Sequence, residues 1–273
     1  MDYLRIEHSA SIRKACRVVG ISQSAYRYHP DPEKDNDVIA GIQKVVAKYP
    51  AYGFSKLLKV LRRWDYTWNH KRVHRIYCLL NLNKRRRGKK RLASRPALQV
   101  AVPETVNACW SIDFMSDSLF CGRRFRTFNV IDDYSREVLA IEVDIGLPSE
   151  RVVRVLDRII AWRNYPAKLR MDNVPELISA NLADWAEKNK VELEFIQPGK
   201  PTQNSYVERF NRTFRDEVLN MYVFKTLSEV REITENWMTE YNEERPHDSL
   251  GDLTPYEFMA TSKKPVNSRL ECA

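Results

Sequence analysis

The sequence has 273 residues, 43% of them hydrophobic and 30% charged, which is typical of a globular protein and not of a disordered one. At ~150 residues per domain this length predicts about two domains. The chain has no apolar run long enough to cross a bilayer and no signal-peptide core at its start, so we expect a cytosolic protein. Five widely spaced cysteines predict neither a disulfide framework nor a zinc site.

The charge is divided unevenly along the chain. Residues 1–100 carry 23 basic and 7 acidic residues, whereas residues 101–273 carry 22 basic and 29 acidic residues. The formal net charge of +9 therefore hides a strongly basic first third. Such asymmetry favours a polyanionic partner held by the N-terminal part, and a basic surface that serves only solubility is the alternative.

The first predicted unit, residues 1–30, is a helix-turn-helix segment. Ser11 is a suitable cap for one short helix, Gly20 suits the turn, and Ser22 suits the cap of the next helix. Many small helical hairpins share this pattern. Pro30 and Pro32 then interrupt the chain.

Residues 33–83 are predicted to form a second helical DNA-binding module. Apolar spacing predicts helices over 36–49 and 55–63, and Asn69 caps a third. That third helix has one apolar face, and its basic residues point elsewhere, which suits a helix that enters a major groove. Its candidate DNA-binding residues are Lys71, Arg72 and Arg75. An ordinary amphipathic helix with a solvated face is the alternative.

A dense basic stretch follows, and we interpret residues 84–103 as a linker. Dense like charge resists folding and favours contact with phosphates. The candidate DNA-binding residues in this linker are Lys84, Arg85, Arg86, Arg87, Lys89, Lys90 and Arg91.

From residue 104 to residue 265 the pattern predicts an α/β domain with a mixed sheet. Three adjacent strands with short connections indicate an antiparallel meander, and strands then alternate with helices. The predicted strands are 109–115, 123–130, 137–143, 168–172 and 193–197, and the predicted helices are 149–163, 180–190, one beginning near Gln203, and 227–243. In helix 149–163 we expect Val152, Val155, Ile159 and Trp162 to share the buried face.

Three carboxylates in this domain suit metal-dependent chemistry on phosphodiesters. Asp113 is the only charged residue of an apolar strand, Asp172 ends a strand, and Glu208 borders the apolar stripe of a helix. Oxygen ligands are the ones that Mg²⁺ prefers, and two such ions ~3.5–4 Å apart can activate both oxygens of a phosphoryl transfer. Each residue also has an ordinary alternative: a buried ion pair, a strand-ending turn, and a surface pair of Glu208 with Arg212.

Other polar residues near this pattern are weaker candidates. We interpret Asp132 and Asp133 as turn residues, with a contribution to the site as the alternative, and His247 as structural. The residues that could contact DNA or order a loop around the helix of Glu208 are Lys200, Asn204, Arg212 and Arg215.

The motifs taken together resemble one family. They are Trp110-Ser-Ile-Asp-Phe, Val130-Ile-Asp-Asp-Tyr-Ser-Arg, Arg170-Met-Asp-Asn, Gly199-Lys-Pro-Thr-Gln-Asn-Ser-Tyr-Val-Glu-Arg-Phe-Asn, and Tyr241-Asn-x-x-Arg-Pro-His. With the 35 residues between the second Asp and the Glu, they resemble the DDE arrangement of the retroviral-integrase superfamily, and more closely that of bacterial insertion-sequence transposases of the OrfB type. Lys48-Tyr-Pro-Ala-Tyr-Gly and Asn69-His-Lys-Arg-Val resemble the helical region of that family.

The resemblance implies an RNase H-like catalytic core with Asp113, Asp172 and Glu208 on two Mg²⁺ or Mn²⁺ ions, and with Asp113 shared between the ions. It also implies terminal inverted repeats and target DNA as substrate, an upstream DNA-binding product as partner, and a homo-oligomer in the active complex. One residue departs from the pattern: Val174 stands where the family usually has Gly, and it would be strained if φ had to be positive there. A catalytically impaired DNA-binding copy and an RNase H-like nuclease are the alternatives.

Overall fold

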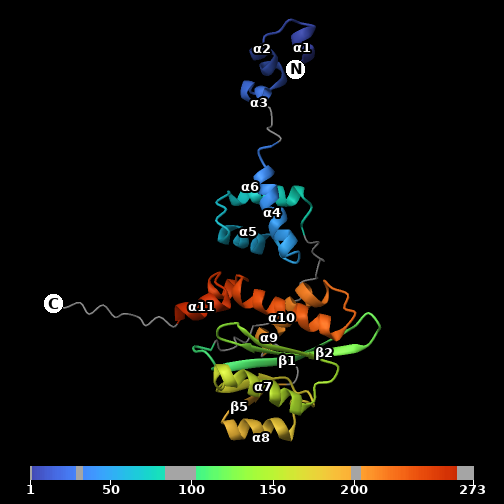
Figure 1. The fold of residues 1–273 in the computed structure, drawn as a ribbon. Coiled ribbons are helices and arrows are strands. Elements are labelled where there is room, and N and C mark those ends of the chain that lie inside the picture. Colours follow the sequence, from blue (N-terminus) through green and yellow to red (C-terminus); the bar gives the residue numbers. More distant parts are fainter. Residues whose placement is uncertain (1, 29–32, 84–102, 198–203, 263–273) are drawn as a thin grey trace, which may run out of the picture.

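The computed structural model describes residues 2–28, 33–83, 103–197 and 204–262. Residues 84–102 of the predicted basic linker, Lys200 and Cys272 fall outside these ranges. Within them, three groups of elements follow one another along the chain: a small N-terminal set of helices, a three-helix module, and an α/β core (Figure 1). No helix of the described ranges has the length and apolar character needed to cross a membrane.

The N-terminal set consists of α1 (Asp2–Ile6), α2 (Ile12–Val19) and α3 (Gln23–Arg27). The predicted caps are confirmed: the Ser11 hydroxyl accepts from the backbone N–H of Lys14, and the Ser22 hydroxyl accepts from that of Ala25. Gly20 ends α2 at φ 74°, a left-handed conformation that glycine adopts without strain.

The three-helix module consists of α4 (Asn36–Lys48), α5 (Phe54–Arg63) and α6 (His70–Leu79). Its core contains the predicted apolar positions, among them Val38, Ile42, Leu57 and Ile76. Gly41 of α4 is needed for close packing, because a Cβ there would lie 2.7 Å from the ring of Trp68. As predicted, the side chain of Asn69 caps α6 by accepting from the backbone N–H of Lys71.

The α/β core is built on a five-stranded mixed sheet in the order β3-β2-β1-β4-β5. The first three strands form the predicted antiparallel meander, and β4 and β5 lie parallel to β1. The strands are β1 (Cys109–Ser118), β2 (Arg124–Asp132), β3 (Val138–Asp144), β4 (Lys168–Met171) and β5 (Glu192–Phe195). The predicted fold class, a mixed sheet preceded by helices, is confirmed.

Helices cover both faces of this sheet. The helices α7 (Ser149–Arg163) and α8 (Ala180–Asn189) pack on one face, and α9 (Ser205–Phe214) and α10 (Leu227–Glu243) pack on the other. The π-helical segment η2 (Arg215–Leu219) continues α9, and η3 (Asp248–Leu250) and α11 (Pro255–Ser262) follow α10. The prediction for Trp162 was wrong: this residue lies in the last turn of α7 and is 57% exposed.

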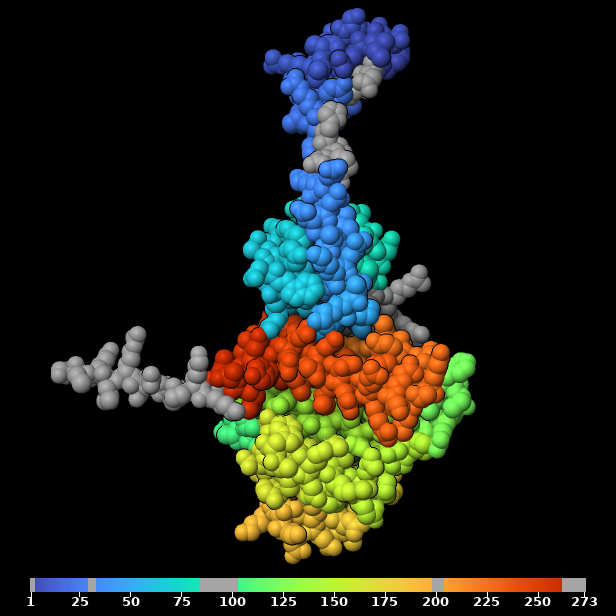
Figure 2. All heavy atoms as spheres, viewed as in Figure 1, coloured from blue at the N-terminus to red at the C-terminus, as the bar shows by residue number. Residues whose placement is uncertain are grey.

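The three-helix module contacts the last part of the core through ion pairs. Lys48 at the end of α4 donates to Glu244 at 2.5 Å. Lys59 of α5 pairs with Asp248 and Asp252 around η3, and Arg63 pairs with Glu257 of α11. In Figures 1 and 2 the module accordingly lies against the C-terminal helices, which separate it from the sheet.

The alternation of side chains along the strands determines what faces α9. In β1, Trp110 and Ile112 join the core under α7 and α8, whereas Met115 joins the core under α9 and α10. Asp113 and Met115 are two residues apart, so their side chains lie on the same face of the strand. The carboxylate of Asp113 therefore points towards α9.

Candidate active site

Asp113 is held by two hydrogen bonds at the centre of the sheet. Its Oδ1 accepts from the backbone N–H of Phe114 at 2.7 Å, and its Oδ2 accepts from Nδ2 of Asn211 at 2.6 Å. Burial, followed by the nearby negative charges of Asp172 and Glu208, raises the pKa of the Asp113 carboxyl to about 7, while the two hydrogen bonds oppose the rise.

The sheet register brings Asp172 to the same place. Ser111 of β1 pairs with Arg170 of the parallel strand β4. Asp113 lies two residues further along β1, and Asp172 lies two residues after Arg170, directly beyond the end of β4. Both side chains therefore emerge on the face under α9. Nδ2 of Asn204 donates to Oδ1 of Asp172 at 3.0 Å and also to the carbonyl oxygen of Ile112 at 3.4 Å. Asn204 therefore connects β1 to the chain after β4.

Glu208 comes from α9, which lies over these strand positions. Val207, Phe210 and Phe214 form the predicted buried stripe of this helix. Glu208 lies about 100° round the helix from Val207 and is exposed at the edge of that stripe. Burial, followed by the charge of Asp172, raises the pKa of Glu208, and the charge of Arg212 opposes the rise.

Three carboxylates thus act on one another electrostatically, and Arg212 is the cation that opposes this effect at Glu208. The charge of Asp172 raises the pKa of both Asp113 and Glu208, and that of Glu208 also acts on Asp113. Across the part of the chain that the structure describes, no group of three or more His, Cys, Asp or Glu side chains is positioned to hold a metal ion. The donors nevertheless fit a hard divalent cation, because they are carboxylates whose mutual repulsion a cation would relieve.

Two asparagines that the sequence prediction missed support Asp113. Asn129 of β2 lies opposite Asp113 in the register. Its Nδ2 donates to Oδ1 of Asn211 at 2.7 Å, and this bond turns the Nδ2 of Asn211 towards Asp113. The sequence carries a signal for both: each is a polar residue inside an apolar stretch, and Asn211 follows Glu208 by three residues, one turn of the same helix.

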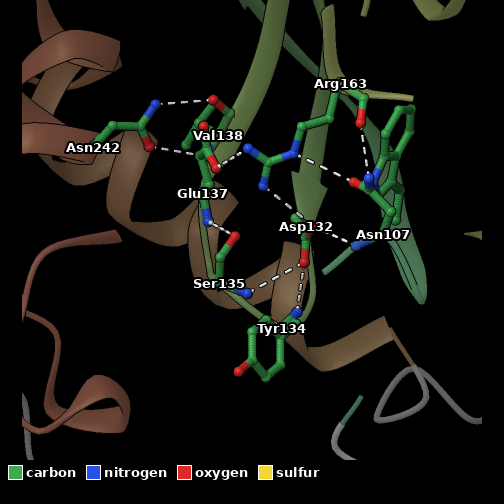
Figure 3. A network of polar contacts seen from close by, with 9 residues as sticks. Asn107, Asp132, Tyr134, Ser135, Glu137, Val138, Arg163 and Asn242 are labelled. Carbon is green, nitrogen blue, oxygen red and sulfur yellow. Dashed lines mark hydrogen bonds and ion pairs between the residues drawn. The ribbon is translucent and has the colours of Figure 1, made fainter. Parts of the chain in front are cut away.

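Asp132 and Asp133 lie away from this site and have other partners. Oδ1 of Asp132 accepts from the backbone N–H groups of Tyr134 and Ser135, and its Oδ2 accepts from that of Asn107 (Figure 3). Asp133 forms a buried ion pair with Arg170 at 2.9 Å. Asp133 lies in the predicted turn, whereas Asp132 is the last residue of β2.

His247 is half-buried and packs against Tyr241, with ring centroids 4.8 Å apart. Burial, followed by the charge of Arg245, lowers the pKa of its imidazole to about 3. The imidazole is therefore neutral at physiological pH.

The residues predicted to contact DNA fall into different environments. Arg72 and Arg75 both pair with Asp35, at 2.9 and 2.6 Å, whereas Lys71 is exposed. The helix of Glu208 carries exposed Arg212, and η2 carries Arg215, which donates to the carbonyl oxygen of Ser116 at 3.0 Å. Asn204 is only 1% exposed, so it supports Asp172 and has no surface with which to reach DNA.

Val174 adopts a conformation that a β-branched residue tolerates. It is absent from the residues with positive φ in the described chain, and its backbone N–H donates to the carbonyl oxygen of Asp172 at 2.9 Å. Its side chain packs against the core under α7 and α8. The backbone at Val174 therefore does not have the positive φ that would strain a valine.

Two models described as an integrase core domain match residues 103–201 and 189–255, and one described as an HTH-like domain matches residues 33–90. The 31.7 kDa protein of insertion element IS407 from Burkholderia multivorans is 41% identical over 98% of this chain and 97% of that protein. The chain belongs to the insertion-element transposases with an integrase core domain.

Two further proteins extend this comparison. The transposase InsD of insertion element IS2 from Escherichia coli is 27% identical over 82% of this chain and 79% of that protein. The integrase-core fold also recurs in a solved simian T-cell lymphotropic virus intasome, at a TM-score of 0.50 and 15% identity, over 85% of this chain and 78% of that chain. At this identity the likeness to the intasome concerns the fold alone.

Proposed function

We propose that this member of the family is an active DNA transposase whose catalytic residues are Asp113, Asp172 and Glu208. The observation that supports this proposal is the grouping of three carboxylates under α9, in which the charge of Asp172 raises the pKa of both Asp113 and Glu208. In a purely structural role such carboxylates would be paired with arginines, as Asp133 is with Arg170.

The three carboxylates would hold two Mg²⁺ or Mn²⁺ ions. When bound, the ions supply activation of the attacking oxygen, neutralisation of the phosphate charge and stabilisation of the leaving oxygen. Asn211 and the backbone N–H of Phe114 hold both oxygens of Asp113, and Asn204 holds one oxygen of Asp172. These bonds fix the carboxylates before substrate arrives, so less ordering is needed during the reaction.

The substrate in this proposal is double-stranded DNA, first at the inverted repeats that end the element and then at the target. Water and later a 3′-hydroxyl would attack the phosphorus in line. Arg212 and Arg215 lie one and two turns beyond Glu208 and would contact the neighbouring phosphates. We further propose that the chain acts in the bacterial cytoplasm as a homo-oligomer, with an upstream DNA-binding product as a possible partner.

A cleavage and strand-transfer assay tests this function. Labelled duplexes carrying the element's ends are incubated with target plasmid and Mg²⁺, and nicked and joined products are resolved on gels. We expect Asp113→Asn, Asp172→Asn and Glu208→Gln each to abolish both products while duplex binding is retained. The matched control is Asp184→Asn, which changes an exposed carboxylate of α8. This variant should leave both products unchanged.

The outcomes separate the alternatives. Cleavage without joined product would favour a nuclease of RNase H type. Metal-independent binding without cleavage, in the presence of any upstream partner, would favour an impaired copy. Near-normal cleavage by one of the three amide variants would remove that residue from the catalytic set.

A further inference from the structure

Two of the sequence motifs take no part in the proposed chemistry. They are Lys48-Tyr-Pro-Ala-Tyr-Gly, at the end of α4, and Tyr241-Asn-x-x-Arg-Pro-His, at the end of α10. They are distant in the sequence, but the hydroxyl of Tyr49 donates to Glu244, and Arg245 lies against the ring of Tyr52. The two motifs therefore meet where the three-helix module contacts the core, and we call this contact of Tyr49 and Tyr52 with Glu244 and Arg245 the joint.

The centre of the joint is a buried cation beside aromatic rings. Arg245 is 5% exposed, and its guanidinium carbon lies 5.4 Å from the ring centres of both Tyr52, in the module, and Tyr241, in the core. Tyr49 stacks on Tyr52 with the ring centres 4.6 Å apart, and both tyrosines are buried. Arginine and tyrosine at a desolvated centre are the residues that most often dominate the binding energy of an interface.

Ion pairs surround this centre, and they all have the same polarity. Among the described residues, the cations of the pairs that connect the two units belong to the module, and the carboxylates belong to the chain after α10. The pairs are Lys48–Glu244, Lys59–Asp248, Lys59–Asp252 and Arg63–Glu257. Pairs at an exposed rim add little affinity, but complementary charge favours one orientation of the partners.

Arg245 is also tied to the helix that carries Glu208. Its ion-pair partner, Glu217, lies in η2, which continues α9, and follows Glu208 by nine residues. Nε1 of Trp237 donates to the same carboxylate oxygen at 3.2 Å, and the Trp237 ring packs on that of Phe214 of α9 with the centroids 5.1 Å apart. One arginine therefore contacts both the module and the continuation of the candidate catalytic helix.

A buried ion pair of this kind adds little net stability. Taking Arg245 and Glu217 out of water costs free energy that their attraction only partly returns, so an apolar pair of similar volume can be as stable. The planar guanidinium, however, must meet its carboxylate and the tyrosine rings in defined directions. The pair therefore favours one placement of the module over others.

We propose that Arg245 is a positioning residue that fixes the three-helix module on the core, and that this fixed placement determines which phosphodiester is cut. The inference rests on the proposed function, because it concerns where that reaction occurs on the substrate. The module would hold DNA through α6 while the carboxylates act on it from the core. The separation between the bound sequence and the cut bond then depends on how the module sits on the core.

Distances between two spin labels test the placement directly. One nitroxide is attached to exposed Cys121 in the core and the other to Lys44→Cys on the exposed side of α4, in a full chain with Cys78→Ser and Cys272→Ser. The remaining two cysteines are buried. Pulsed EPR of this parent chain, which has the native joint, should give a single narrow distance distribution.

The variant that removes the centre of the joint combines Arg245→Met with Glu217→Gln. It removes one positive and one negative charge, so the net charge and the non-specific attraction to DNA do not change, and the amide oxygen can still accept from Trp237. We expect loss of the narrow distance while circular dichroism shows a folded chain. An unchanged narrow distance would overturn the proposal.

A second variant keeps the test decisive if the first does not fold. Glu244→Lys with Asp248→Lys places like charges opposite Lys48 and Lys59, and the two altered side chains are 44% and 80% exposed. Repulsion across the rim should also abolish the narrow distance. The matched control makes the same charge change on α8, with Asp184→Lys and Glu187→Lys at exposed positions, and should keep the distance.

The position of the cut tests the consequence. Nicks in an end-labelled duplex that carries the element's end are mapped to single nucleotides, with duplex binding measured in parallel. The native chain and the α8 control should nick one main phosphodiester, whereas the two joint variants should bind the duplex and spread their nicks over neighbouring positions. A loss of total cleavage with the nick position unchanged would mean that Arg245 supports the fold only, and would overturn the proposal.

The outcome is separable from that of the proposed function, because the spin-label distances do not depend on cleavage. If the native chain does not cut, the catalytic proposal is wrong, and the distances alone decide whether Arg245 fixes the module. If the native chain and both joint variants cut at the same single position, the inference about the joint is wrong and the catalytic proposal stands.

Discussion

Two groups of carboxylates on the central strands have opposite electrostatic surroundings. At the end of β2, Asp132 accepts hydrogen bonds from three backbone N–H groups, and the next residue, Asp133, pairs with Arg170. Further along, Asp113 has two hydrogen bonds and faces two other carboxylates. Burial raises the pKa of both Asp113 and Asp133, but Arg170 lowers that of Asp133 whereas Asp172 and Glu208 raise that of Asp113 further.

This difference shows how a structural carboxylate can be told from a catalytic one. Burial alone does not decide, because it acts on both groups in the same direction. The sign of the neighbouring charges decides, since a structural group is stabilised by its neighbours and a metal ligand is destabilised until a cation arrives. Removing the charge of Arg170 should therefore lower the free energy of unfolding, whereas removing the charge of Asp113 should raise it.

The largest effect on stability is expected from Arg170→Met. It leaves Asp133 buried without its cation, and we expect a loss of about 3 kcal/mol or more in the free energy of unfolding.

Asp113→Asn should instead raise that free energy at pH 8 in EDTA, because it removes a charge that two carboxylates repel. Urea titrations at pH 8 and pH 5 measure both changes.

The pH dependence checks the cause of the gain in Asp113→Asn. The folded-state pKa of Asp113, about 7, lies above its ordinary value of 3.8. The metal-free native chain therefore loses stability as pH rises from about 4 through 7. At pH 5 Asp113 is protonated and resembles asparagine, so the gain should largely disappear. A variant that is less stable than the native chain at pH 8 would contradict the repulsion.

A smaller effect, measured on activity, is expected at Asn211. Asn211→Ala removes the donor to Oδ2 of Asp113, and support of this kind for a metal ligand is worth about 10- to 100-fold in activity or metal affinity. Cleavage measured against Mg²⁺ concentration should show a raised Mg²⁺ requirement, with partial recovery at high Mg²⁺.

Two further variants show whether this effect passes through Asp113. Asn129→Ala should shift the Mg²⁺ requirement in the same direction but less, because it acts only through Asn211. Asn181→Ala on α8 has no contact with the site and should change nothing. An unchanged Mg²⁺ requirement in Asn211→Ala would mean that Asp113 is oriented by the backbone N–H of Phe114 alone.

The sequence predicted the elements well where apolar periodicity was strong. The helices α7 and α10 begin and end where they were expected, and the stripe of α9 is buried as predicted. Trp162 was misplaced because periodicity does not reveal where a helix stops being covered, and this residue of the last turn is exposed.

The supporting residues of the site were harder to predict for a different reason. Asn129, Asn211 and Asn204 act through contacts between elements that are far apart in the sequence, so their roles depend on strand register and on how α9 lies over the sheet. Likewise, Arg72 and Arg75 were predicted to contact DNA, but Asp35, the residue just before α4, pairs with both. Only tertiary structure shows such partners.

The smallest effect is expected at Val174, where sequence and structure disagree most directly. A glycine would be favoured at this position only if φ had to be positive, and φ is not positive here. Val174→Gly should therefore leave cleavage and strand transfer within about twofold, and should destabilise the chain by about 1 kcal/mol through lost packing and a more flexible unfolded chain. Parallel cleavage assays and urea titrations of the two chains measure this. Activity that appeared only in the glycine variant would mean that the backbone after Asp172 must turn to positive φ during the reaction, so that the arrangement described for Asp172 is not the active one.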